Sequence, residues 1–235
     1  MNDYTKIRFT STVDPDRSVI LTLPSKPEQF QEAMRSIGAG TIGTGCKVTD
    51  FISDIPALDQ LLAVNPDAVI NATPDELNYA AARIAVLTPP ERELLDAVSE
   101  SPLRLRKLEQ IIDFQENSEF FLLIPEAKNA DALGRYYAYQ SGMVDMPEKW
   151  KAAIDFEKLG MIAAEAERGA FTAHGYVLPT GDEWTPYFEK NRSVPTAYRI
   201  TGAEVRPSVK ERLNSPKSRP SGSPKHKHST LDNER

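Results

Sequence analysis

The chain has 235 residues, of which 40% are hydrophobic, and a formal net charge of −6 at pH 7. This composition is typical of a soluble globular protein with one large core or two to three small ones, and it excludes a fibrous protein. No apolar run approaches the ~20 residues that span a bilayer, and Asp3, Asp14 and Asp16 stand where a signal peptide has a basic start and an apolar block, so we expect a cytoplasmic protein with no membrane partner.

The first 55 residues are predicted to form an N-terminal α/β unit. Two β-branched, apolar runs flank the turn-forming residues 14–17, which predicts a β-hairpin. Ser25 and Glu28 have the spacing of a capping box and predict the start of a helix. The predicted elements of residues 1–55 are strands at 5–13, 18–23 and 46–51 and a helix that ends at Gly38.

Residues 56–118 are predicted to form a helical middle unit. Thr73 and Glu76 have the spacing of a capping box, with Pro74 at the first helical position, and Thr88 and Glu91 repeat the pattern. Apolar residues recur at helical spacing behind each cap. We expect four short helices, which begin near Pro56, Thr73, Thr88 and Ser101.

Residues 119–182 are predicted to form a C-terminal α/β unit. It should contain a strand at 120–124, helices at 130–141 and from Pro147 onward, and an alternating strand or hairpin at 169–178. In the helix after Pro147 we expect four apolar residues to face inward: Trp150, Ile154, Leu159 and Ile162. The fold class is thus α+β, an elongated chain of small units.

The end of the chain differs in composition and charge from the rest. Residues 183–205 are predicted to be an extended segment, partly ordered by aromatic side chains. Residues 206–235 contain eight Lys or Arg against three Asp or Glu, a net of +5, and almost no large apolar residue, so we expect a disordered basic tail. A nucleic-acid binder that acts through this tail stays an open alternative.

The remaining 205 residues carry the negative charge. They contain 20 basic and 31 acidic residues, a net of −11. DNA affinity comes largely from basic groups that release counterions from phosphates, so we expect no direct DNA binding by the acidic folded part. An acidic surface suits a basic partner, although the same charge density can serve solubility alone.

Motifs for catalysis, metals and cofactors are missing from the sequence. Cys46 is the single cysteine, and none of the three histidines belongs to a His-Glu-x-x-His motif. The glycine run at 38–45 lacks the Gly-Lys-Ser/Thr ending of a phosphate loop and follows a helix. We expect no enzyme, cofactor or metal. His174 is interpreted as a turn or interface residue, with a general-base role left open.

Carboxylates recur along the predicted helices at spacings of three and four residues. Neighbouring charges on such a stripe lie ~5 to 6 Å apart, comparable with the ~7 Å between successive phosphates of one DNA strand. A row of helix carboxylates can therefore stand in for a phosphate backbone, although the solvent face of most amphipathic helices has the same pattern. The candidate partner-binding carboxylates are Glu93, Asp96, Glu100, Glu109, Asp113, Glu116, Glu126, Asp131, Asp145, Glu148, Asp155, Glu157, Glu165 and Glu167.

Residues 133–147, 154–160 and 169–176 resemble the C-terminal part of the ArdA antirestriction proteins, and residues 75–83 resemble the family more weakly. The family consists of acidic DNA mimics that dimerise, occupy the DNA groove formed by the specificity and methylation subunits of type I restriction-modification enzymes, and protect a mobile element. The resemblance implies the same function and a homodimer joined through the C-terminal units. Phe171, His174 and Tyr176 are the candidate dimer interface.

Two features depart from the family pattern. Arg104, Arg106 and Lys107 interrupt the acidic middle helices, and the basic tail is not typical of the family. The alternative is therefore an acidic interaction protein on the same scaffold that inhibits a different nuclease, a defence complex or a transcription component.

Overall fold

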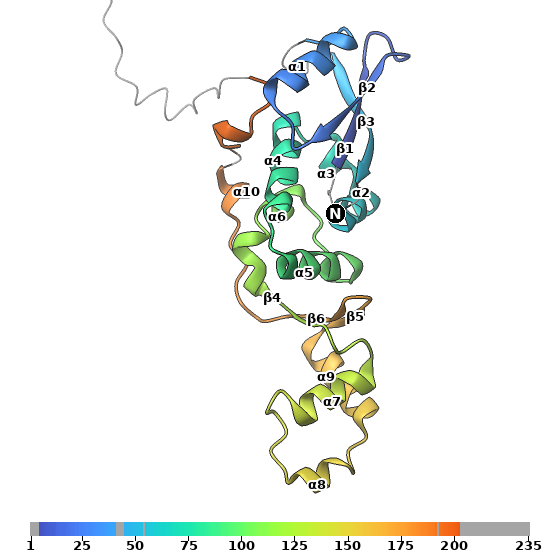
Figure 1. The fold of residues 1–235 in the computed structure, drawn as a ribbon, viewed down its shortest axis with the longest axis vertical. Helices are drawn as coiled ribbons and strands as arrows, with labels where there is room; N and C mark the ends of the chain where they lie inside the picture. Colours follow the sequence, from blue (N-terminus) through green and yellow to red (C-terminus); the bar gives the residue numbers. More distant parts are fainter. Residues whose placement is uncertain (1–4, 41–44, 54, 192, 203–235) are drawn as a thin grey trace, which may run out of the picture. The chain divides into compact units, whose positions relative to one another are not determined.

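A computed structural model describes residues 5–40, 45–53, 55–191 and 193–202. Within these ranges the fold is α+β, as predicted, with helices and two three-stranded antiparallel sheets (Figure 1). No helix of the described ranges is long and apolar enough to cross a membrane. The predicted basic tail and residues 41–44 of the glycine run lie outside the described residues.

The first sheet has the strand order β2-β1-β3. The predicted hairpin is confirmed, because the turn between its strands is closed by the Arg17 amide, which donates to the Asp14 carbonyl at 3.0 Å, and by an ion pair between the two side chains. Helix α1 packs on the sheet, with the Phe9 and Phe30 rings edge to face at 6.0 Å. The strands are β1 (Thr5–Ser11), β2 (Ser18–Leu23) and β3 (Cys46–Ser53), and helix α1 is Pro27–Ser36.

The start of α1 differs from the prediction by one residue. Pro27 occupies the first turn and Lys26 is the N-cap residue, so the side chain three positions further on is Gln29. Its Oε1 atom accepts from the Lys26 amide at 3.0 Å. The predicted capping box of Ser25 and Glu28 is therefore wrong, whereas Gly38, with φ of +70°, follows the helix as expected.

The middle of the described chain is helical, and both predicted capping boxes are confirmed. Glu76 Oε2 accepts from the Thr73 amide at 2.8 Å, and Glu91 Oε2 accepts from the Thr88 amide at 2.7 Å. These bonds satisfy amide groups that a helix start leaves unpaired. The helices are α2 (Pro56–Val64), α3 (Pro66–Ile70), α4 (Pro74–Ala85), α5 (Pro89–Glu100) and α6 (Leu108–Ile112).

The prediction that a helix begins near Ser101 is wrong. The Ser101 hydroxyl donates to the Val98 carbonyl at 2.8 Å and accepts from the Leu103 amide at 3.0 Å, so it closes a turn at the end of α5. Helix α6 begins only at Leu108. The Gln110 side chain accepts a hydrogen bond from the amide of Lys107, the residue before this helix.

The second sheet has the order β4-β6-β5, and the predicted hairpin at its end is confirmed. One helix from Pro147 was expected, but there are two, because the Asp155 carboxylate accepts from the Lys158 amide at 3.0 Å and starts a new helix. The elements are η1 (Gln115–Phe120), β4 (Phe121–Ile124), α7 (Ala130–Tyr139), α8 (Glu148–Lys151), α9 (Phe156–Glu167), β5 (Ala170–Thr172) and β6 (Gly175–Pro179).

The inward orientation predicted for the apolar residues of this region is partly wrong. Trp150 and Ile162 are 61% and 57% exposed, respectively. Leu159 does pack against the smaller hydrophobic core, and Ile154 is half-buried. Trp150 lies in α8 and Ile162 in α9, so the two residues do not lie on one continuous helical face.

Two glycines allow α7 and α9 to touch. A Cβ atom on Gly134 would lie 1.9 Å from the Phe156 carbonyl oxygen, and one on Gly160 would lie 1.9 Å from the Ala130 carbonyl oxygen. Any side chain at these positions would collide with the backbone of the neighbouring helix. Both glycines lie in the segments that resemble the antirestriction family.

The described chain has a larger and a smaller hydrophobic core. The larger one extends from Ile7 in β1 to Ile200 near the end of the described residues. The smaller one lies around Leu133, Tyr137 and Tyr176. Helix α10 (Tyr187–Asn191) and the short helix η2 (Thr196–Tyr198) follow the second sheet. The larger core thus draws side chains from all three predicted units, whose boundaries stay a prediction.

Candidate partner-binding surface

Helix α5 presents two of the candidate carboxylates to solvent. The side chains of Glu93 and Glu100 are 49% and 36% exposed, while Leu95 and Val98 are buried in the larger core. Asp96, between them in sequence, pairs with Arg92 at 3.4 Å and is mostly covered. The predicted stripe is therefore present in α5, but its middle charge is neutralised within the chain.

His174 lies between the two exposed carboxylates of α5. Its Nδ1 atom is 4.0 Å from Glu93 Oε1, and its Nε2 atom is 3.6 Å from Glu100 Oε1. These distances place both carboxylates beside the ring and are too long for hydrogen bonds. His174 is thus directed at its own chain rather than outward from the β5–β6 hairpin.

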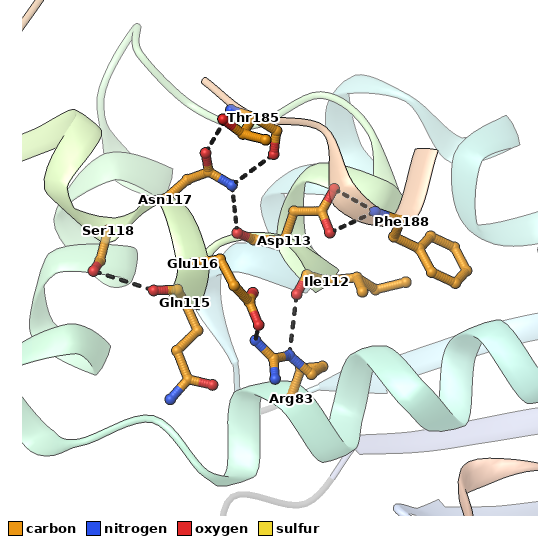
Figure 2. Close-up of polar contacts among 9 residues, drawn as sticks. All are labelled: Arg83, Ile112, Asp113, Gln115, Glu116, Asn117, Ser118, Thr185 and Phe188. Carbon is orange, nitrogen blue, oxygen red and sulfur yellow. Dashed lines mark hydrogen bonds and ion pairs between the residues drawn. The ribbon is translucent and has the colours of Figure 1, made fainter. Parts of the chain in front are cut away.

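Asp113 was predicted to be a surface carboxylate, and this prediction is wrong. It is 3% exposed, and both its oxygens accept from the Phe188 amide, at 2.9 and 3.0 Å (Figure 2). Burial is the main cause that raises the pKa of this carboxyl above its usual range. Asp113 has a structural role and presents no charge to a partner.

Glu116 and Glu109 flank Asp113 in sequence and are more accessible. Glu116 is exposed and pairs with Arg83 of α4, whose Nε atom also donates to the Ile112 carbonyl at 3.2 Å (Figure 2). Glu109 is half-buried in the wall of a cavity of about 170 Å³ that Asp67 and Glu76 also line. The second predicted stripe is therefore only partly formed.

Several candidate carboxylates of the C-terminal region have partners within the chain. Asp131 pairs with Arg135 at 2.7 Å, and Glu148 pairs with Lys151 at 3.4 Å. Asp155 caps α9, as described above. Four others are exposed and make no ion pair or hydrogen bond with another described side chain: Glu126, Asp145, Glu157 and Glu165.

Glu167 joins two tyrosines inside the smaller core. It accepts from the Tyr137 hydroxyl at 2.6 Å and from the Tyr176 hydroxyl at 2.9 Å. Burial and the bonds to this carboxylate raise the pKa of both phenols. Tyr176 is 0% exposed, so the prediction that it contacts a second copy is wrong. Phe171, at 39%, is the exposed member of the predicted interface.

Only three of the predicted carboxylates lie in the most uniformly acidic part of the chain: Glu93, Asp96 and Glu100. Residues 50–103, which include α2 to α5, contain ten Asp or Glu and two Arg. Both arginines, Arg83 and Arg92, are paired with carboxylates. Asp59 and Asp67 of this region are exposed and were not among the candidates. A running count of charge would have identified them, whereas a search for helical stripes did not.

The arrangement is that of an acidic surface on an α+β scaffold. Within the described ranges, no group of three or more His, Cys, Asp or Glu side chains could hold a metal ion. The family model described as "Antirestriction protein (ArdA)" matches residues 17–178, more than half of the chain. The chain therefore belongs to the ArdA antirestriction family, and this membership supports an antirestriction function. No curated protein matches it.

Proposed function

We propose that the protein inhibits a type I restriction-modification enzyme by occupying the DNA groove of its specificity and methylation subunits. Carboxylates take the place of DNA phosphates in this mode, and a mobile element is protected from cleavage in the cytoplasm. Inhibition is stoichiometric, since a mimic only needs to bind.

One observation supports this proposal more strongly than the others. No Lys, Arg or His occurs between Lys47 and Arg83, and the only two arginines of residues 50–103 are paired with carboxylates of the same chain. The helices of this region therefore offer no free cation that would repel a basic groove. A groove that binds DNA is lined with cations, and its attraction to such a surface is long-ranged and screened by salt.

A homodimer joined through the C-terminal region is part of the proposal. Family membership supports it, and three apolar side chains of this region are exposed in the single chain: Met161, Ile162 and Phe171. Large exposed apolar residues are common at subunit interfaces. Sedimentation of the purified protein should give the mass of two chains, and Ile162→Asp should shift it to one.

A different target on the same scaffold is the second candidate. Arg106 and Lys107 are exposed directly after the acidic region and before α6. They interrupt an otherwise negative surface and suit a partner whose groove carries an acidic residue at that place. Recovery of a nuclease or transcription component in place of restriction subunits, in a pull-down from host lysate, would favour this candidate.

A cleavage assay tests the main proposal. Unmodified DNA is incubated with a type I restriction-modification enzyme and increasing amounts of the purified protein. We expect full protection near one dimer per DNA-binding groove, and weaker protection at high salt. The proposal is refuted by normal cleavage at saturating protein.

A further inference from the structure

Residues 183–191 and 193–202, here called the strap, follow the second sheet and return along the middle helices. They lie beyond residue 178, where the match to the antirestriction family ends. Helix α10 of the strap contacts α6, and η2 contacts α4. Three strap side chains, Phe188, Val194 and Ile200, are at most 7% exposed and belong to the larger core.

The first half of the strap is held by two side chains at the end of α6 and in η1. Asp113 accepts from the Phe188 amide with both oxygens, as described above. Asn117 accepts from the Thr185 amide at 2.7 Å and donates to the Thr185 carbonyl at 3.0 Å (Figure 2). The Asn117 side chain also donates to the Asp113 carbonyl at 2.8 Å, which fixes its orientation.

The second half is held by two side chains of α4. Asp75 Oδ1 accepts from the amides of Ile200 and Thr201 at 2.7 and 2.9 Å, and Oδ2 accepts from the Thr201 hydroxyl at 2.8 Å. Asn78 donates to the Tyr198 carbonyl at 2.9 Å. Bonds from amides to a carboxylate are about twice as strong as bonds between neutral groups.

The side-chain packing between the strap and the helices beneath it is less complete than the hydrogen bonding. The centroid of the Tyr79 ring of α4 lies 5.8 Å from that of Phe188 and 4.9 Å from that of Tyr198. Two pockets that open to solvent, of about 170 and 160 Å³, both have Phe188 in their walls. They interrupt the contact between the strap and the helices beneath it, so attachment of the strap also depends on its hydrogen bonds.

We propose that the strap opens and closes as one cooperative unit without global unfolding, and that Asp75 and Asp113 are the two latches that set its opening free energy. Each latch binds backbone amides of the strap from a different helix. Opening uncovers Tyr79 and releases both carboxylates to solvent, so the open and closed chains present different surfaces to a partner. Folded proteins commonly open one segment at a time, with a free energy smaller than that of global unfolding.

Native-state hydrogen exchange of the full wild-type chain in low concentrations of urea tests the cooperative opening. We expect the amides of Phe188, Ile200 and Thr201 to exchange through one common opening, with a smaller free energy and a smaller urea dependence than the amides of Ile7 and Phe9 in β1. Exchange of the strap amides only through the same opening as β1 would overturn the proposal.

Variants of the full chain test the latches. Asp75→Ala and Asp113→Ala should each raise exchange ~10 to 100-fold at both Phe188 and Ile200, because loss of one charged hydrogen-bond acceptor weakens the whole unit. The conservative variants Asp75→Asn and Asp113→Asn should restore most of the protection, since an amide oxygen still accepts. Glu32→Gln, on the exposed side of α1, is the matched control and should change nothing.

A purely local effect contradicts the proposal. Faster exchange only at the amide that lost its acceptor would mean that the two halves open independently. Equal acceleration in β1 would mean that the latches stabilise the whole fold and not the strap. Should an alanine variant fail to fold, the urea dependence of the wild type and the exchange of the asparagine variants still decide between these outcomes.

Discussion

At the residue scale, the same side-chain type has opposite roles within a few positions. Asp113 is buried and bonded to a backbone amide, whereas Glu116 is exposed and paired with Arg83. A buried carboxylate is tolerated only with hydrogen-bond donors beside it, and it then acts as part of the core. A count of acidic residues therefore overstates the charge that a partner meets.

The raised pKa of Asp113 predicts a pH dependence of stability. Because burial raises the folded-state pKa above the unfolded value of about 3.9, the contribution of this group is fully present below the unfolded value and is lost as pH rises through the folded one. Asp113→Asn does not titrate. We expect the free energy of unfolding of the variant, relative to wild type, to increase from pH 4 to pH 7. Urea unfolding at several pH values measures this difference, and a difference that is constant or falls would contradict it.

At the element scale, the crossing of α7 and α9 depends on glycine. Gly160→Ala would place a methyl group 1.9 Å from the Ala130 carbonyl oxygen, so the helices must move apart. We expect a loss of about 1 to 3 kcal/mol in the free energy of unfolding, the usual range for overpacking. Ala166→Ser, on the exposed side of the same helix, is the control and should stay within about 0.5 kcal/mol of wild type. Urea unfolding measures both, and equal effects would contradict the role of the crossing.

Elements were predictable where their signals are local. The caps at Thr73 and Thr88 form within four residues, and both were predicted. The hairpins were found because alternating strands flank turn-forming residues. Helix α3 has only five residues, too few for an apolar period to be recognised. Ser101 has the composition of a cap but closes a turn instead.

The candidate site was less predictable because its details depend on distant partners. Asp113 is buried by Phe188, 75 residues further along the chain. Arg83 and Glu116, 33 residues apart, neutralise each other. Tyr176 lies on β6, where residues 175–178 are all buried, and its hydroxyl is held inside by Glu167. Sequence spacing indicates which face of its own helix or strand a side chain lies on. It does not indicate which distant residues pack over that face.

At the scale of the whole molecule, inhibition should depend on where the negative charges lie and not only on their number. Glu93, Glu100 and Asp67 are exposed in the acidic helices, and Glu28, Glu32 and Glu183 are exposed elsewhere. Single changes to the neutral amide should weaken inhibition less than ~3-fold, since the contacts add up. The triple change in the acidic helices should weaken it ~10 to 100-fold, and the triple change elsewhere, with the same net charge, much less. Inhibition constants from cleavage assays compare the two, and equal loss would mean that net charge alone matters.

Competition with DNA for one enzyme tests the central claim most directly. Displacement of a labelled unmodified duplex from a type I restriction-modification enzyme is measured over a range of protein and salt concentrations. We predict complete, competitive displacement, with an affinity that falls linearly with salt on logarithmic axes, as it does for the DNA that is replaced. Simultaneous binding of DNA and protein, or an affinity independent of salt, would contradict the account.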